Sequence, residues 1–198
     1  MNLINAKELD ALNTQIKQCT LCEAALPFEP RPVVQLAASA KLLIIGQAPG
    51  TRVHDSGIAW DDASGQRLRE WLAIPPEVFY DPQQVAIMPM GFCYPGKAKS
   101  GDLPPRKECA PQWHKRIREQ LPNIQLTLLI GQYAQRYYLP HAKKFSLTDT
   151  VKQWQEYQPQ YFALPHPSPR NQIWLKRNPW FEQQVVPSLR DAITRMGF

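Results

Sequence analysis

KLLIIGQAPG, residues 41–50, decides the fold, because an unbroken apolar run stops abruptly at a Gly-Gln-Ala-Pro-Gly turn. A short, continuous apolar run of this kind is typical of a strand that is buried on both faces of a parallel sheet. The turn resembles a phosphate-cradling loop, but it lacks the Lys-Ser/Thr pair of a P-loop and the spacing of a dinucleotide fingerprint. The stretch therefore predicts a buried parallel strand and argues against nucleoside triphosphate chemistry.

Strand-like and helix-like segments alternate on both sides of this stretch. Further strands are expected at 85–90, 124–131 and 160–167. Helices are expected over 6–16, from 64 to the residue before Pro75, from Pro104 through Ile117, over 132–139 and over 181–193. Such alternation predicts a parallel sheet with helices on both faces. We therefore expect one α/β domain over residues 1–198, a three-layer α/β/α structure with a short parallel sheet of about four strands.

Three unusual segments follow three of the predicted strands. They are GQAPGTRVHDSGIAW at 46–60, PMGFCYPGK at 89–97 and PHPSPRN at 165–171. In parallel sheets ligands bind at the carboxyl ends of the strands, where the loops after those strands meet. The sequence thus predicts that the three segments converge on one cleft.

Four cysteines form a second feature. Cys19 and Cys22 make a C-x-x-C at the end of the first predicted helix, and Cys93 and Cys109 follow later in the chain. A redox C-x-x-C normally follows a strand in a βαβ unit, whereas this one precedes every predicted strand. Four thiolates suit tetrahedral zinc or an iron–sulfur cluster, and the remaining interpretation is a redox pair plus two inert buried thiols.

Composition narrows the class of protein. The chain has 198 residues, 20 of them proline, and a formal net charge of +6, which suits a polyanionic partner. No apolar stretch approaches the roughly 20 residues of a membrane span, and no charged segment followed by an apolar run marks a signal peptide. We expect a soluble, cytoplasmic monomer that does not contact a membrane.

His166 is the strongest single candidate for chemistry. Pro165 and Pro167 flank it and hold its backbone extended, although a hydrogen-bonded histidine in a rigid turn is an alternative interpretation. Ser168 and Arg170 follow as phosphate contacts would. Lys176 and Arg177 add positive charge downstream, as DNA contacts or as solvated surface charges.

Taken together, GQAPG, the four cysteines and HPSPRN resemble the uracil-DNA glycosylase superfamily, and most closely its iron–sulfur family 4. The first motif of that family aligns without gaps on residues 46–65. Gly57 and Gly65 match its glycines, and Trp60 stands where the family has phenylalanine. The resemblance implies removal of uracil or another deaminated base from DNA by a monofunctional glycosylase, as in base excision repair.

The resemblance also implies a role for each matched residue. A [4Fe–4S] cluster would be held by Cys19, Cys22, Cys93 and Cys109. The flipped base would be contacted by Gly46, Gln47, Ala48, Trp60, Met90 and His166. The DNA would be contacted by Pro49, Gly50, Ser168, Arg170, Lys176 and Arg177. His166 would donate to a uracil carbonyl and stabilise the charge that appears on the departing base.

Two departures from the family pattern lie in the predicted cleft. Gln47 replaces a glutamate, and Pro89 replaces an asparagine that reads the uracil edge. Besides Gln47 and His166, the candidates for activating water are then His54, Asp55 and Asp61. His54 and Asp55 could instead be ordinary loop residues. Because proline cannot make an edge contact, we expect a broader choice of bases than in relatives that carry asparagine.

Two other functions fit the same residues. A cluster-bearing nucleic-acid-binding module without catalysis is compatible with Gln47 and Pro89. A zinc-bearing hydrolase could use His54, Asp55 and His166 as its catalytic groups. Iron analysis separates the zinc enzyme from the other two, and base-excision assays separate the glycosylase from the binding module.

Overall fold

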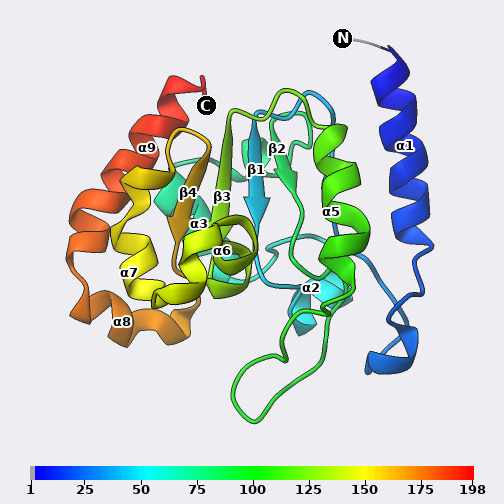
Figure 1. The fold of residues 1–198 in the computed structure, drawn as a ribbon, viewed down its shortest axis with the longest axis horizontal. Coiled ribbons are helices and arrows are strands. Elements are labelled where there is room, and N and C mark those ends of the chain that lie inside the picture. The colour runs from blue at the N-terminus through cyan, green and yellow to red at the C-terminus, as the bar shows by residue number, and fades with distance from the viewer. Residues whose placement is uncertain (1–2) are drawn as a thin grey trace.

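The computed structural model describes residues 3–198. These residues form a parallel sheet of four strands with helices on both sides (Figure 1). The strands are β1 (Leu42–Ile45), β2 (Val85–Ile87), β3 (Leu126–Ile130) and β4 (Tyr161–Leu164). Their order is β2-β1-β3-β4, with Leu42 opposite both Val85 and Leu126. The predicted parallel sheet is confirmed, and residues 1 and 2 of the expected 1–198 domain lie outside the described part.

The strands are buried on both faces, which explains their continuous apolar sequences. Leu42 and Ile44 belong to one hydrophobic core, and Leu43 and Ile45 belong to the other. Alternate residues of a strand point to opposite faces, so each strand contributes to both cores. The sheet therefore separates two helical layers, as the three-layer expectation requires.

Helices cover the two faces unequally (Figure 1). The first core includes residues of α2 (Thr51–Ser56), α3 (Ala63–Leu72), α4 (Pro76–Phe79), α7 (Leu147–Lys152), α8 (Gln172–Arg177) and α9 (Val186–Arg195). The second includes residues of α1 (Leu3–Lys17), α5 (Cys109–Glu119) and α6 (Gln132–Tyr138). Helix α1 lies outside α5, at the edge of the molecule (Figure 1).

Shorter helical turns complete the chain. They are the 3-10 segments η1 (Glu23–Ala25), η2 (Pro140–Lys144), η3 (Trp154–Tyr157) and η4 (Pro169–Asn171), and the π-helical segment η5 (Phe181–Val185). The predicted helix over 181–193 is thus a π-helical segment that continues into α9. In the described residues no helix is long and apolar enough to cross a bilayer.

The helix expected to begin at Pro104 instead begins at Cys109. Proline lacks an amide hydrogen, and it is tolerated in the first turn of a helix but not in the interior. Beginning at Cys109 places Pro111 in the first turn, whereas a start at Pro104 would place it in the interior. Residues 88–108 are therefore a long loop between β2 and α5, visible below the sheet in Figure 1.

Candidate functional site

A cavity of about 270 Å³ lies at the carboxyl ends of the strands, and we call it the strand-end pocket. Its lining includes Gly46, Gln47, Ala48, Pro49, Gly50, Trp60, Asp62, Pro89, Asp102, His166, Ser168 and Arg170. All three of the segments that follow β1, β2 and β4 contribute to it, as predicted. The chain places β2 on one side of β1 and then crosses to place β3 on the other side. The pocket lies beside β1, at this change of direction, which is where open α/β sheets bind ligands.

Trp60 is held in the pocket by two glycines. A Cβ on Gly46 would be 2.8 Å from Cζ2 of the Trp60 ring, and a Cβ on Gly65 would overlap the Trp60 carbonyl oxygen. Trp60 itself has a φ of 59°, in the left-handed region that non-glycine residues rarely adopt. Such strained conformations are retained where the surrounding structure enforces them, and they cluster at functional sites.

His166 lies against Trp60 in the lining of the pocket. The two ring centroids are 5.6 Å apart, with an interplanar angle of 32°. Its backbone carbonyl accepts a 2.7 Å hydrogen bond from Nδ2 of Asn171, which fixes the turn after β4. Burial lowers the pKa of His166, an effect that the Asp62 carboxylate partly opposes. A neutral imidazole is thus favoured, with one ring nitrogen able to donate.

Pro89 is fixed from behind by α5. The side chain of His114 is only 1% exposed. Its Nε2 atom lies 3.0 Å from the Pro89 carbonyl oxygen, and its Nδ1 atom lies 2.6 Å from the Tyr138 hydroxyl oxygen. Burial lowers the pKa of His114 to about 4 and raises that of Tyr138, so the tyrosine donates to Nδ1 and Nε2–H donates to Pro89. Sequence analysis missed His114, although it neighbours Trp113 on the predicted helix.

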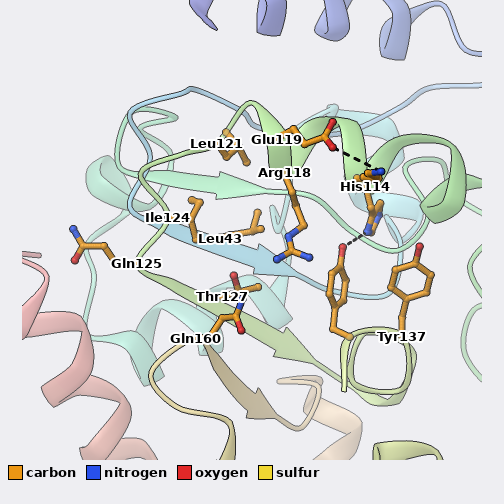
Figure 2. A pocket seen from close by; sticks show the side chains of 12 residues that line it. Leu43, His114, Arg118, Glu119, Leu121, Ile124, Gln125, Thr127, Tyr137 and Gln160 are labelled. Carbon is orange, nitrogen blue, oxygen red and sulfur yellow. Dashed lines mark hydrogen bonds and ion pairs between the residues drawn. The ribbon is translucent and has the colours of Figure 1, made fainter. Parts of the chain in front are cut away.

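A larger cavity of about 490 Å³ lies on the other side of this histidine (Figure 2). It covers the sheet between α5 and α6, and it is lined by Leu43, Arg118, Thr127 and Tyr138 among others. None of the predicted site residues lines it. Its size alone does not make it the better candidate, because the strand-end pocket holds the converging polar groups that mark a binding site.

Asp102 is a pocket residue that sequence analysis missed. It comes from the long loop after β2, and a Cβ on Gly50 would be 3.5 Å from its Oδ2 atom. The same loop is tied to the first motif, because Nε2 of Gln47 donates to the carbonyl oxygen of Leu103 at 3.1 Å. An acidic residue in a loop at the carboxyl edge of the sheet was the signal that could have found it.

Several predicted site residues lie outside the pocket lining. His54, on α2, has its ring 5.2 Å from the ring of Phe28 and 6.0 Å from that of Tyr94. Asp55 follows it on α2, and its backbone carbonyl accepts from Arg31 at 2.8 Å. The structure does not bring His54 or Asp55 to His166, because the short helix α2 turns this segment toward residues 28–31.

Met90, Lys176 and Arg177 also lie outside the lining of the strand-end pocket. Met90 is buried in the core that faces α5 and α6, although its backbone N–H donates to the Gly46 carbonyl at 2.9 Å. Lys176 and Arg177 are exposed at the end of α8. These two charges remain free to meet a large ligand beyond the pocket.

The four cysteines lie together around a separate small space of about 20 Å³, which we call the cysteine cavity. Cys19 and Cys22 come from the segment after α1, Cys93 from the loop after β2, and Cys109 from the first residue of α5. All four are free thiols. The cysteines thus join the N-terminal helix to the loop after β2.

The donor set tests which group could occupy the cysteine cavity. Burial raises the pKa of Cys109 to about 12 and that of Cys93 to about 11, so thiolates here need a positive partner. The Cys109 sulfur accepts a 3.4 Å hydrogen bond from the Phe92 amide, a contact typical of sulfurs that ligate iron. Among residues 3–198, no three Cys, His, Asp or Glu side chains are arranged to hold a single metal ion.

Comparison with protein families assigns the chain independently. A family model described as the uracil DNA glycosylase superfamily matches residues 33–190, about four fifths of the chain. The match contains every segment of the strand-end pocket together with Cys93 and Cys109, and it begins after Cys19 and Cys22. The chain therefore belongs to the uracil-DNA glycosylase superfamily, whose members are glycosylase hydrolases that act on DNA.

Proposed function

We propose that the protein removes uracil or another deaminated base from DNA by flipping the nucleotide and hydrolysing its N-glycosidic bond. The observation that carries this proposal is the strand-end pocket, where the Trp60 and His166 rings face each other 5.6 Å apart. A glycosylase must take its base out of the stack and hold it by stacking and hydrogen bonds. The pocket offers an aromatic ring, a fixed imidazole and the backbone of Gly46–Ala48 for that purpose.

The departing base needs a donor that is in place before the bond breaks. Cleavage leaves negative charge on the base, and preorganised donors aimed at such charge lower the barrier. His166 fits this role because Pro165, Pro167 and the Asn171 hydrogen bond fix its position. Its lowered pKa favours the neutral ring, and a neutral imidazole still carries one N–H group that can donate to the developing anion.

The edge of the base is read weakly in this proposal. Pro89 presents a pyrrolidine ring, and its carbonyl oxygen is already held by His114. Stacking on Trp60 tolerates any base, whereas discrimination between bases depends on contacts to their edges. We therefore expect the enzyme to accept more than one deaminated base.

The DNA backbone would be bound at the rim of the pocket. Pro49, Gly50, Ser168 and Arg170 line the pocket, and the exposed Arg170 supplies a positive charge. Lys176 and Arg177, exposed on α8, would extend the track along the strand. The net charge of +6 favours such a partner, because phosphate contacts supply most of the affinity of non-specific DNA binding.

We also propose that Cys19, Cys22, Cys93 and Cys109 hold a [4Fe–4S] cluster. The four thiols come from three separate segments and line one cavity, and four Cys thiolates are the usual ligand set of a [4Fe–4S] cluster. The cluster would supply a structural link between α1 and the loop after β2. Iron and acid-labile sulfide near four each per chain in freshly purified protein is the expected result, and zinc without iron would contradict it.

The test of the proposed activity is a panel of oligonucleotides. Each carries one uracil, hypoxanthine, xanthine or mispaired thymine at the same position, in single-stranded and duplex form, with cytosine at that position as the control. We expect release of at least two of the deaminated bases and none of cytosine. Salt-dependent binding without release from any oligonucleotide would contradict the enzyme and favour the nucleic-acid-binding module.

A further inference from the structure

The loop after β2 is folded onto the strand-end pocket. Its residues 96–103 form a compact turn closed by two backbone hydrogen bonds, Ala98 N–H to Gly101 O at 3.0 Å and Leu103 N–H to Gly96 O at 2.8 Å. Gly101 has a φ of 84°, and a Cβ there would lie 3.2 Å from Nη1 of Arg170. The turn therefore rests against the segment that follows β4.

Gln47 fastens this loop to the first motif. Its side-chain amide donates to the Leu103 carbonyl oxygen at 3.1 Å, across 56 residues of sequence. A carboxylate at position 47 could not donate this hydrogen bond, because an ionised carboxylate is an acceptor only. The amide of Gln47 thus suits a residue that positions the loop.

Two acidic residues, Asp62 and Asp102, line the described pocket. Asp62 is engaged, because its Oδ1 atom accepts from the Gly65 amide at 2.8 Å and caps the start of α3. Asp102 has no hydrogen-bond or ion-pair partner within the described residues, and it lines the pocket while remaining partly accessible to solvent. Asp102 is thus the pocket carboxylate that is free to contact a ligand or a water molecule.

We propose that Asp102 is the catalytic base of the glycosylase, delivered to the pocket by the 96–103 turn and positioned by Gln47. This proposal rests on the proposed function. Water adds its oxygen to C1′ of the flipped nucleotide and gives one proton to the Asp102 carboxylate. The C1′–N bond breaks, and its electron pair leaves with the base, which His166 stabilises. The proton then passes from Asp102 to solvent, and the base anion takes one up.

The surroundings of Asp102 support this role. Partial burial raises its pKa, which brings a carboxylate nearer to the operating pH and makes it a stronger base. The positive charges of Arg170 and Lys97 oppose that rise, and the negative charge of Asp62 adds to it. A carboxylate beside the sugar also stabilises the cationic character that C1′ acquires as the bond breaks.

The test is single-turnover base release by Asp102→Asn, with Asp191→Asn as the control. Asp191 is exposed on α9, so its variant carries the same change of charge away from the pocket. We expect Asp102→Asn to release base at least about 100-fold more slowly, the usual scale for losing a general base, with affinity for DNA changed less than about threefold. The rate of the control should equal that of the wild type.

The pH profile of base release distinguishes the catalytic base, Asp102, from the residue that positions it, Gln47. In the wild type the rate should fall at acidic pH as Asp102 is protonated, and this acid limb should be absent from Asp102→Asn. Gln47→Ala should keep the acid limb, but its maximal rate of base release should be about tenfold lower than that of the wild type. Amide hydrogen exchange of residues 96–103 should become faster in this variant. An unchanged exchange rate would overturn the positioning role of Gln47.

Two further results would overturn the assignment, and they differ from each other. If the wild type releases base and Asp102→Asn releases it equally fast, Asp102 is not the base while the proposed function stands. If the wild type releases no base from any oligonucleotide of the panel, the proposed function fails and the assignment fails with it.

Discussion

The strand-end pocket and the cysteine cavity contrast in how they are built. The pocket is lined by loops after three strands, with half-buried or exposed polar side chains such as His166, Asp102 and Arg170. The cavity is small, and Leu26, Phe92 and Trp113 line it beside the thiols. Both share the loop after β2, which sends Cys93 to one and Asp102 to the other. In the proposed function, the pocket would perform the chemistry, and the cysteine cavity would fix the loop that serves it.

The largest expected effect separates the two regions by stability. Cys19→Ser removes one proposed ligand, and loss of a structural metal group belongs to the mutations that cost on the order of 4 kcal/mol. Thermal or denaturant unfolding should show this loss, with Thr20→Ser as the control from the same segment. The relative rates on the different bases should stay the same. A variant of unchanged stability that no longer releases base would reverse the assignment of the two regions.

Changing His166 should slow base release and leave the stability of the protein almost unchanged. His166→Ala removes the proposed donor to the departing base, which we expect to slow single-turnover release by about 10²–10³-fold. DNA affinity and unfolding free energy should change little. His141→Ala is the matched control, because His141 is exposed on η2 away from the pocket. Equal rates for the two variants would remove His166 from the reaction.

His114 links the pocket to α5 and α6, so its titration should appear in stability. Its folded-state pKa of about 4 lies below the ordinary value of 6.5, because burial and the Arg118 charge disfavour the cation. The unfolded chain therefore takes up the proton first, and stability falls as the pH drops from about 6.5 to about 4. The loss should be at most about 3 kcal/mol.

The measurement for His114 is denaturant unfolding across that pH range. His114→Gln should show a shallower dependence on pH in this window, although it is less stable at neutral pH. His141→Gln serves as the control, because it removes an exposed histidine. A wild-type protein whose stability does not change between pH 6.5 and 4 would exclude the buried neutral histidine.

Trp60 should affect every base equally. Trp60→Ala removes a stacking surface worth about 1–3 kcal/mol per base, so binding of uracil-, hypoxanthine- and xanthine-containing DNA should weaken by similar factors. Trp60→Phe should recover most of this affinity. Competition binding measures the ratios between bases, and a loss confined to one base would show that Trp60 reads the base edge.

The smallest expected effect concerns the basic residues that we propose contact the DNA backbone. Arg170→Gln should reduce the slope of log affinity against log salt by about one phosphate contact on duplex DNA. Lys176→Gln should do the same if α8 also meets the backbone. Lys7→Gln on the distant helix α1 is the control. Slopes that match the wild type for both variants would place the DNA elsewhere.

The fold could be predicted because its signals are local. Apolar runs such as LLII at 42–45 and LTLLI at 126–130 are continuous, and buried parallel strands need such runs. The helices that were missed, among them α2 and α7, have six residues each, too few to show a helical period. The start of α5 was wrong because the position of Pro111 outweighs the proline pair at 104–105.

The sequence could predict those site residues whose place follows from the order of strands and loops along the chain. Trp60 and His166 belong to loops that leave strand ends, so their meeting in one pocket follows from the parallel sheet. His54 and Asp55 do not reach it, because α2 turns them toward Phe28 and Arg31. Asp102 reaches it through the Gln47–Leu103 hydrogen bond, a tertiary contact that no sequence period encodes.

The tight packing around Trp60 limits how the pocket can be re-engineered. Position 46 cannot gain a side chain without displacing the ring, and position 65 cannot gain one without displacing the Trp60 backbone. A mutant library that varies these glycines would therefore disturb Trp60 in most of its members. Base preference is better diversified at position 89, where the backbone is held by His114 and the residue lines the pocket. The pocket thus has a rigid wall and one variable position.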